Sequence, residues 1–563
     1  MPFRWHVPPA NPLRARALAA SVGVHPLTAQ LLLNRGVADA AQARRFLRPS
    51  LAALGDPSAL PDMERAAARL KRAVIRQEPI ILFGDSDVDG LTASVILYEL
   101  LRDLGASVRA KPANRIAHGY GLPELFVRQL IRIGAKLLIL VDCGTNQPDA
   151  IRRLAEAGIE TIVVDHHVPL REWAKPYALV NPHRGAGAGA GRELCSAGLA
   201  FKVAQALLGA GSERLLAYLD LAALGTLADC SQLVGDSRIL VALGVARIVD
   251  SHRGGLRHLC EATGTMSAEP EQVIKRLIPR LNASGRMGDA RAVWHLLASE
   301  PDRRWDRWLE EAEAAHAAAK QLHRQIIAEA HAQVARLHFK DQFVVVVSRA
   351  GWHPGLMGPV ASQLAQQYGR PAIAIAMEEE QGVGSGRSIP RFNLLEALQA
   401  CEDMLLRFGG HAQACGLTVN RKHLEPFRAM VNQQVQRLLG REGLAPSRLV
   451  DLELPLAAIT PDWVGETMRL SPFGYGNPRP TVAIHGIALE AVSPRLGVIS
   501  DGTRRLEARG RFATLGTGER YDVVAQPVLA GGALTLTVSD VRAETAPSEP
   551  GPTSGRPRTR GSA

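Results

Sequence analysis

One apolar run that ends in a cluster of acids constrains this chain more than any other feature. Residues 80–83 are apolar, and after a glycine they lead into aspartates at alternate positions, Asp85, Asp87 and Asp89. A short aliphatic and β-branched run is typical of a parallel strand buried on both faces, and residues 91–104 predict the helix that follows. The carboxylates then lie at the carboxyl end of a strand, where open α/β sheets place their ligands. Taken alone, the motif fits an acidic surface turn or a calcium loop equally well.

Two further segments repeat the pattern of an apolar strand followed by an acid. Residues 137–141 lead into Asp142, and residues 161–164 lead into Asp165, His166 and His167. Between them, residues 148–157 followed by a glycine predict a crossover helix. The unit is therefore βαβ, and parallel connections of this kind place strand ends on one edge of the sheet.

A fourth acid, Asp229, follows the helical stretch 220–228. Each acid or histidine has an ordinary structural interpretation: Asp142 as a helix cap, the histidine pair as packing, Asp229 as a loop carboxylate. Several such groups at the ends of adjacent parallel strands predict a dinuclear metal site instead. Upstream, Asp62 is predicted to cap a helix over residues 63–77.

Composition narrows the class of protein. A chain of 563 residues predicts about three domains, and 46% hydrophobic with 21% charged residues is typical of a soluble globular protein. No stretch approaches the ~18 consecutive apolar residues of a membrane span, and no signal peptide is recognisable, so we expect a cytoplasmic protein. Six scattered cysteines exclude a disulfide framework or structural zinc site, and a net charge of +11 favours nucleic acid as the partner.

The order of motifs is also recognisable. The chain contains Asp-Ser-Asp-Val-Asp-Gly at 85–90, Asn-Arg at 114–115 before Gly-Tyr-Gly-Leu at 119–122, Val-Asp at 141–142, Asp-His-His at 165–167, Gly-Thr-Leu-Ala-Asp at 225–229, Pro-Arg-Leu-Asn-Ala-Ser-Gly-Arg-Met at 279–287, Gly-Trp-His-Pro-Gly at 351–355, Gly-Ser-Gly-Arg-Ser at 384–388 and Phe-Gly-Gly-His at 408–411. This ordered set resembles the DHH phosphoesterase superfamily and, within it, the RecJ family of single-stranded-DNA-specific 5′-to-3′ exonucleases.

The resemblance implies an α/β fold with a parallel-sheet DHH domain, a long helix, a second α/β domain of the DHHA1 type and a C-terminal OB-like β-barrel. The expected divisions are an N-terminal helical segment at 1–60, the DHH domain at 61–300, the connecting helix at 301–340, the DHHA1 domain at 341–447, the OB-like domain at 448–543 and a disordered tail at 544–563. In the barrel, Phe512 and Tyr521 are candidates for base stacking and, equally, for the core.

The resemblance also implies two divalent cations, Mn²⁺ or Mg²⁺, which suit oxygen and imidazole ligands. The residues expected to hold them are Asp85, Asp87, Asp89, Asp142, His166 and Asp229, with Asp142 as the bridge and Asp85 alternatively lying just behind the ligands. His167 is expected at the scissile phosphate, and Asp165 is expected to orient a histidine. The expected catalytic residues are Asp87, Asp89, Asp142, His166, His167 and Asp229.

A second set of residues is expected to hold DNA phosphates. Its members are Asn114, Arg115, Arg280, Asn282, Arg286, Ser385, Arg387, Ser388, Gly410 and His411. The implied activity is two-metal hydrolysis of single-stranded DNA to 5′-mononucleotides in recombination and repair, by a monomer, with a helicase and a single-stranded-DNA-binding protein as candidate partners.

Two rivals remain. Another DHH activity, on oligoribonucleotides, cyclic dinucleotides or pyrophosphate, is typical of smaller relatives. A binding protein of the same fold without chemistry would have lost acids, whereas here all the expected carboxylates and both histidines are present.

Overall fold

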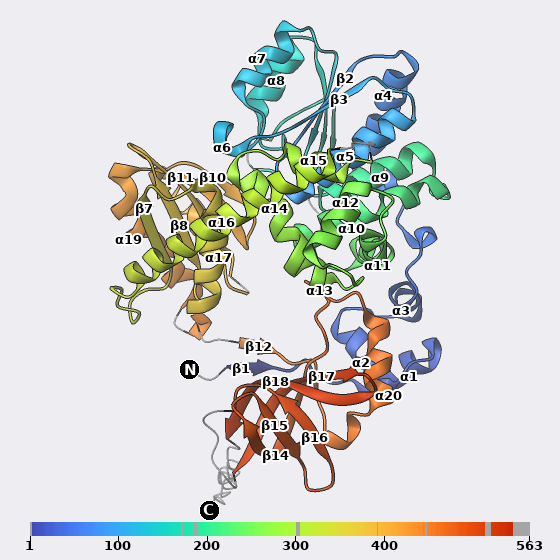
Figure 1. Ribbon diagram of the computed structural model, residues 1–563, viewed down its shortest axis with the longest axis vertical. Coiled ribbons are helices and arrows are strands. Elements are labelled where there is room, and N and C mark those ends of the chain that lie inside the picture. The colour runs from blue at the N-terminus through green and yellow to red at the C-terminus, as the bar shows by residue number, and fades with distance from the viewer. Residues whose placement is uncertain are drawn as a thin grey trace, which may run out of the picture. The chain divides into compact units, whose positions relative to one another are not determined.

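The computed structural model describes residues 3–170, 173–184, 189–299, 304–390, 392–440, 442–444, 447–512 and 519–543 (Figure 1). It divides into two compact units. The barrel unit comprises Met1–Ala43, Pro446–Arg469 and Arg479–Ala563, and the sheet unit comprises Arg44–Ala445 and Leu470–Pro478. The tail expected to be disordered, 544–563, lies outside the described residues. Among the described residues, no helix combines the length and apolarity needed to cross a membrane.

The first sheet of the sheet unit is parallel, as predicted, with the order β3-β2-β4-β5-β6. Its strands are β2 (Ile80–Gly84), β3 (Val108–Pro112), β4 (Leu137–Val141), β5 (Glu160–Val164) and β6 (Ala178–Val180). The strand that precedes Asp142, β4, is the middle strand, as expected.

Helices cover both faces of this sheet, which explains the uninterrupted apolar runs. Side chains alternate along β4: Leu137 and Ile139 pack in the core with α4 (Met63–Ile75), α5 (Val88–Asp103) and α9 (Ser196–Leu208), while Leu138 and Leu140 pack with α7 (Glu124–Arg132) and α8 (Pro148–Glu156). Helix α8 is the predicted crossover.

Helices complete this domain and lead to the next. They are α6 (Arg115–His118), α10 (Leu219–Ala228), α11 (Gly235–Val249), α12 (Gly254–Thr263), α13 (Pro270–Gln272), α14 (Ile278–Met287) and α15 (Arg291–Leu297). The Ala-, Glu- and Gln-rich stretch that follows forms one helix, α16 (Trp305–Val334), as predicted.

The second sheet has the order β10-β11-β9-β8-β7, with only β7 and β8 parallel. The strands are β7 (Val345–Ala350), β8 (Ala372–Met377), β9 (Gln381–Arg387), β10 (Leu405–Gly410) and β11 (Ala414–Asn420). One core contains residues of α16 and α17 (Met357–Tyr368), and the other contains residues of α18 (Leu394–Gln399) and α19 (Leu424–Leu439).

The barrel unit contains a closed five-stranded barrel, consistent with the expected OB fold. Its strands are β14 (Val482–Ser493), β15 (Leu496–Ser500), β16 (Arg505–Arg509), β17 (Arg520–Ala530) and β18 (Ala533–Ala543), and β14 pairs with β17 to close it. Phe512 is 2% exposed and Tyr521 is 4% exposed, so both are core residues and not stacking platforms.

The N-terminal segment belongs to the same compact unit as the barrel. Strand β1 (Arg4–His6) pairs in parallel with β12 (Ser447–Leu449), and helices α1 (Pro12–Val22) and α2 (Pro26–Asn34) follow it. The N–H of His25, before α2, donates to Glu466 of α20 (Pro461–Thr467). Two more elements complete the fold: β13 (Leu452–Glu453) pairs with β14, and α3 (Ala40–Leu47) crosses from one unit to the other.

The predicted cap of α4 is wrong. Asp62 has φ 52° and makes no side-chain cap hydrogen bond. Its carboxylate instead accepts from the N–H of Leu179, in β6, and from Arg184, so a contact distant in sequence has replaced the local one.

A short segment of the C-terminal region, Leu470–Pro478, belongs to the sheet unit. The guanidinium of buried Arg238 donates to the carbonyls of Ser471, Pro472 and Phe46, and the N–H of Leu233 donates to the carbonyl of Tyr475 at 2.8 Å. This segment therefore fixes the chain just after Asp229.

Candidate metal centre

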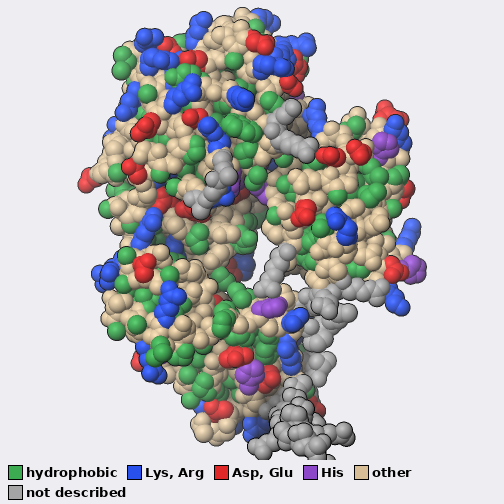
Figure 2. Space-filling model, turned by 180° about the vertical axis from the view of Figure 1, so that it is seen from behind, with side chains coloured by type: hydrophobic (Ala, Val, Ile, Leu, Met, Phe, Trp, Pro, Cys, Tyr) green, Lys and Arg blue, Asp and Glu red, His purple; other side chains and the backbone are tan. Residues whose placement is uncertain are grey.

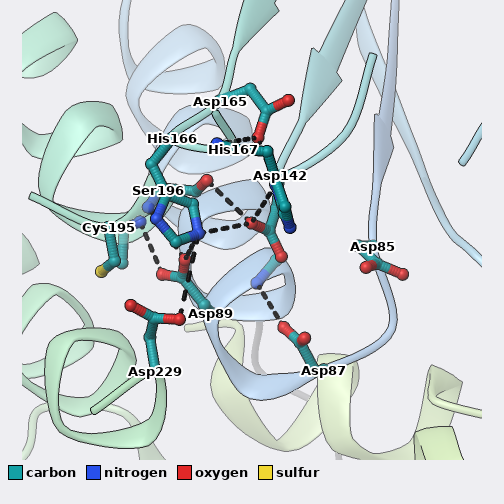
Figure 3. A network of polar contacts seen from close by, with 12 residues as sticks. Asp85, Asp87, Asp89, Asp142, Asp165, His166, His167, Cys195, Ser196 and Asp229 are labelled. Carbon is teal, nitrogen blue, oxygen red and sulfur yellow. Dashed lines mark hydrogen bonds and ion pairs between the residues drawn. The ribbon is translucent and has the colours of Figure 1, made fainter. Parts of the chain in front are cut away.

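The predicted acids and histidines converge at one edge of the first sheet (Figure 3). Asp87 caps α5, accepting from the N–H of Gly90 at 3.1 Å, and Asp89 lies in the first turn of that helix. Asp142 follows β4 with φ 60°, a left-handed conformation that is uncommon for a residue with a side chain and concentrates at functional sites. His166 follows β5, and Asp229 follows α10.

One imidazole contacts carboxylates from three different elements. His166 Nε2 lies 3.4 Å from Asp142 Oδ1, 3.7 Å from Asp89 Oδ2 and 3.9 Å from Asp229 Oδ1. Donor atoms of Asp89, Asp142 and His166 all lie within 4.8 Å of one another, and so do those of Asp85, Asp87 and Asp142. Asp142 is common to both groups, which is the position expected of a bridging ligand.

Burial and crowding oppose ionisation of Asp142 and Asp89. Burial, with Asp87 and Asp89 nearby, raises the pKa of Asp142 well above its usual range. Burial and the neighbouring Asp229 raise the pKa of Asp89 to about 6. Burial alone would lower the pKa of His166, but Asp229 and Asp142 raise it well above its usual value. Such a cluster of hard oxygen donors and one imidazole is a donor set that fits Mn²⁺ or Mg²⁺.

Sequence reasoning missed the helix N-terminus behind these acids. The N–H groups of Ser196 and Ala197, at the start of α9, donate to the two oxygens of Asp89 at 2.8 Å each, and the Ser196 hydroxyl donates to Asp142 Oδ1 at 2.9 Å. The positive end of the helix dipole favours carboxylates there. The available signal was a serine that opens a long apolar helical run.

We expect Ser196→Ala to weaken Mn²⁺ affinity by about 10–100-fold, the usual effect of removing a partner that orients a ligand. Isothermal titration of Mn²⁺ measures it. Ser94→Ala is the matched control, because Ser94 is also buried but donates to the carbonyl of Leu91 and accepts from Trp294. Equal losses of Mn²⁺ affinity in the two variants would contradict an orienting role for Ser196.

His167 is held by Asp165, the acid predicted to orient a histidine. Nδ1 of His167 lies 2.7 Å from Asp165 Oδ1, and the carboxylate also accepts from the N–H of Thr145. Burial would raise the pKa of Asp165, but the adjacent His167 lowers it overall. The Tyr120 hydroxyl lies 3.1 Å from the carbonyl oxygen of Asp142 and 3.2 Å from His167 Nδ1.

Arg115 lies against the acids and bridges two of them. Its guanidinium donates to both oxygens of Asp85 and, at 2.9 Å, to Asp87 Oδ2. Burial raises the pKa of Asp85 despite this partner. Burial would also raise the pKa of Asp87, but Arg115 and the N–H of Gly90, with other neighbours, lower it overall. Asp85 is thus both within the donor cluster and the partner of a predicted phosphate-binding arginine.

Two more of the predicted arginines lie close to Arg115. Burial and the neighbouring Arg387 lower the pKa of Arg286 to about 10, and burial lowers the pKa of Arg387, with Arg115 adding to the effect. Arg387 donates to the hydroxyl of Ser385 at 2.7 Å and to the carbonyl of Gly386. Burial of positive guanidiniums close to one another makes a site suited to an anion.

His411 directly follows β10 and lies beside His166 and His167. Its ring stacks on His167 at 5.2 Å between centroids and lies 5.5 Å from the ring of His166. Burial and the two other histidines lower its pKa to about 3. Gly410 has φ 129°, and a Cβ there would lie 2.4 Å from the carbonyl oxygen of Ala414, so the turn that presents His411 requires glycine.

Four predicted phosphate-binding residues have other partners. Arg280 pairs with Glu313 at 2.7 Å. Asn114 caps α6, Asn282 accepts from the N–H of Val88, and Ser388 donates to the carbonyl of Phe392. These contacts give Arg280 a counter-ion and the other three a structural role.

Family models match three parts of the chain. The N-terminal domain of the DHH family matches residues 79–226, the DHHA1 domain matches residues 340–437 and the RecJ OB domain matches residues 450–497. The fold and the site thus define a DHH-type protein with a DHHA1 domain.

Curated relatives and solved structures identify the family within that class. The single-stranded-DNA-specific exonuclease RecJ of Bacillus subtilis is 36% identical over 87% of this chain, and that of Thermus thermophilus is 34% identical over 87% of this chain and 70% of its own length. Crystal structures of Thermus thermophilus RecJ with Mn²⁺ and with Mg²⁺ have TM-scores of 0.82 and 0.72, identities of 30% and 29%, and cover 97% of this chain in each case and 80% and 79% of theirs. The chain belongs to the RecJ family. It spans 62% of the length of the Bacillus subtilis relative.

Proposed function

We propose that this protein is a metal-dependent exonuclease that degrades single-stranded DNA from 5′ to 3′, releasing 5′-mononucleotides. One observation carries the proposal. A cluster of carboxylates and histidines from the first sheet lies beside Arg115, Arg286 and Arg387 and beside His411 from the second sheet. Hydrolysis of a phosphodiester needs acidic residues that bind metal ions and cationic side chains that hold the phosphate.

In this proposal two divalent cations, Mn²⁺ or Mg²⁺, are held by Asp87, Asp89, Asp142, His166 and Asp229. When bound, the ions supply charge stabilisation to the attacking and leaving oxygens of an in-line displacement. Asp85 can serve as a further ligand or keep Arg115 in place. Asp165 holds His167 with Nδ1 engaged, which leaves Nε2 to face the scissile phosphate.

The arginines and the second domain hold the strand. Arg115, Arg286 and Arg387 provide planar donors for phosphate oxygens, and Ser385, Gly410 and His411 complete that wall. Asn114, Asn282 and Ser388 shape it, and the pairing of Arg280 with Glu313 leaves that residue a smaller part in strand binding. Lys and Arg side chains are scattered over the face seen in Figure 2, and the net charge of the chain is +11.

The relatives' names support single-stranded DNA as the substrate. Recombination and repair are the corresponding roles, and we propose a cytoplasmic monomer assisted by a helicase and a single-stranded-DNA-binding protein. The domain limits proposed from the sequence remain 61–300 for the DHH domain, 341–447 for the DHHA1 domain and 448–543 for the OB-like domain, with the helix at 301–340 between the first two.

The test is hydrolysis of a matched set of labelled substrates, namely single-stranded DNA, duplex DNA, RNA and dinucleotides, by purified protein. We expect cleavage of single-stranded DNA from the 5′ end with Mn²⁺ and none after chelation of the metal by EDTA. Cleavage confined to dinucleotides or short RNA would support the alternative DHH activities. Strand binding without any cleavage would indicate a binding protein.

A further inference from the structure

We propose that His166, His167 and His411 form a second kind of metal site, one that takes Zn²⁺ or a similar late transition ion and inhibits the enzyme when filled. Ligand nitrogens of the three imidazoles all lie within 4.8 Å of one another. Imidazole donors suit Zn²⁺, Cu²⁺ and Ni²⁺, whereas Mn²⁺ and Mg²⁺ favour oxygen. The cluster therefore differs in selectivity from the carboxylate centre beside it.

The second observation is that His411 Nε2 is buried and has no hydrogen-bond partner. A buried polar atom without a partner is rare and calls for an explanation. His411 stacks on His167 with an interplanar angle of 26° and faces His166 at 30°. The unpartnered nitrogen thus belongs to a ring that lies against the two other imidazoles.

The third observation is the partner of His167. Its Nδ1 lies 2.7 Å from Asp165 Oδ1, so the carboxylate fixes the tautomer in which Nε2 carries a lone pair. A carboxylate behind a histidine is the usual arrangement at zinc sites. A tetrahedral site with Zn–N bonds of ~2.0–2.1 Å needs nitrogens about 3.3 Å apart. Binding would require the rings to turn out of their stacked arrangement, so that the three lone pairs point at one ion.

Filling this site would compete with the reaction. His166 would be drawn away from Asp89, Asp142 and Asp229, and His167 and His411 could no longer contact phosphate. This consequence rests on the proposed function, whereas the binding of the ion does not. Because His166 is also a proposed ligand of the carboxylate centre, Zn²⁺ should compete with both the DNA strand and Mn²⁺.

The binding test is titration of Zn²⁺ against a chromophoric zinc indicator, with the protein held in excess Mn²⁺. We expect the native protein to bind one Zn²⁺ per chain more tightly than His411→Ala does, by more than the 10–100-fold typical of an outer partner. His411→Cys keeps a good zinc ligand and should restore the affinity. His423→Ala, in the same domain but outside the cluster, is the control.

A spectroscopic experiment with Co²⁺ tests whether His411 binds the ion directly. Co²⁺ in a four-coordinate nitrogen site absorbs visible light more strongly than Co²⁺ in a six-coordinate oxygen site, so the native protein should show this band and His411→Ala should not. Unchanged Zn²⁺ affinity in His411→Ala, or absence of the Co²⁺ band from the native protein, would overturn the proposal. A protein that binds Zn²⁺ through His411 but cuts no DNA would overturn the proposed function alone.

Discussion

Replacing Asp142 with asparagine is expected to lower the rate of DNA hydrolysis by about a thousandfold or more. The ions at such a centre contribute several kcal/mol to the stabilisation of transition-state charge, and each ~1.4 kcal/mol corresponds to a tenfold change in rate. Asp142 is the one acid common to both groups of donor atoms, so its loss weakens both. Single-turnover hydrolysis of 5′-labelled single-stranded DNA with Mn²⁺ measures the effect.

The same substitution should stabilise the metal-free protein at pH 7.5. The pKa of Asp142 is raised well above its usual value in the fold, so the folded state binds the proton more tightly than the unfolded chain. Stability of the metal-free native protein therefore falls as pH rises above about 3.9, the pKa of an unperturbed aspartate. Asparagine carries no charge and removes this dependence.

Thermal unfolding with and without Mn²⁺ tests the stability prediction. We expect a higher Tm for metal-free Asp142→Asn than for the native protein at pH 7.5, a smaller difference at pH 5 and a smaller rise on adding Mn²⁺. Asp149→Asn is the control, because Asp149 is an exposed acid paired with Arg152 and should change neither quantity. Hydrolysis within tenfold of the native rate would remove Asp142 from the metal centre.

Arg387→Ala is expected to reduce kcat/KM on 5′-phosphorylated single strands by about 10–100-fold. Charge-assisted hydrogen bonds contribute about 1.5–3 kcal/mol, and ~1.4 kcal/mol corresponds to a tenfold change. Its described partners are the Ser385 hydroxyl and the Gly386 carbonyl, and no carboxylate is among them. The preference for a 5′-phosphate over a 5′-hydroxyl should narrow, and Mn²⁺ affinity should stay the same.

Arg280→Ala is the matched control for Arg387→Ala. Arg280 was predicted from the sequence to bind phosphate, but it pairs with Glu313 and should change kcat/KM much less. If Arg387→Ala kept the full preference for the 5′-phosphate, recognition of the strand's end would pass to Arg286, a half-buried arginine of the same cluster.

Local pattern was sufficient to predict the first sheet and the acids at its edge. The runs that became β2, β4 and β5 are apolar because both faces are covered, and the position of Asp142 beside Asp89 follows from the rule for parallel strands. The same reasoning predicted α8 and α16 because both depend on helix propensity and on their end signals.

Contacts between distant parts of the chain could not be predicted in this way. Nothing near Asp62 indicates that it will turn toward Leu179, and nothing near Ser196 indicates that its hydroxyl will reach Asp142. The stacking of His411 on His167 depends on how two domains pack within the sheet unit. Arg280 lies in a motif from which phosphate binding was predicted, but in the fold its guanidinium pairs with Glu313.

The barrel unit contains an N-terminal segment that precedes the sheet unit in the sequence and C-terminal segments that follow most of it. This order affects how the chain can fold during synthesis. Trp5 Nε1 donates to Asp540 Oδ2, 535 positions later, and β1 pairs with β12. Neither contact can form until the later segment has been synthesised. Residues 44–445, which hold the whole metal centre, are synthesised before β12 and can begin to fold while β1 lacks its partner strand. A chain released before Ser447 would contain every acid and histidine of the metal centre but would leave β1 without its partner strand, which cellular proteases could recognise.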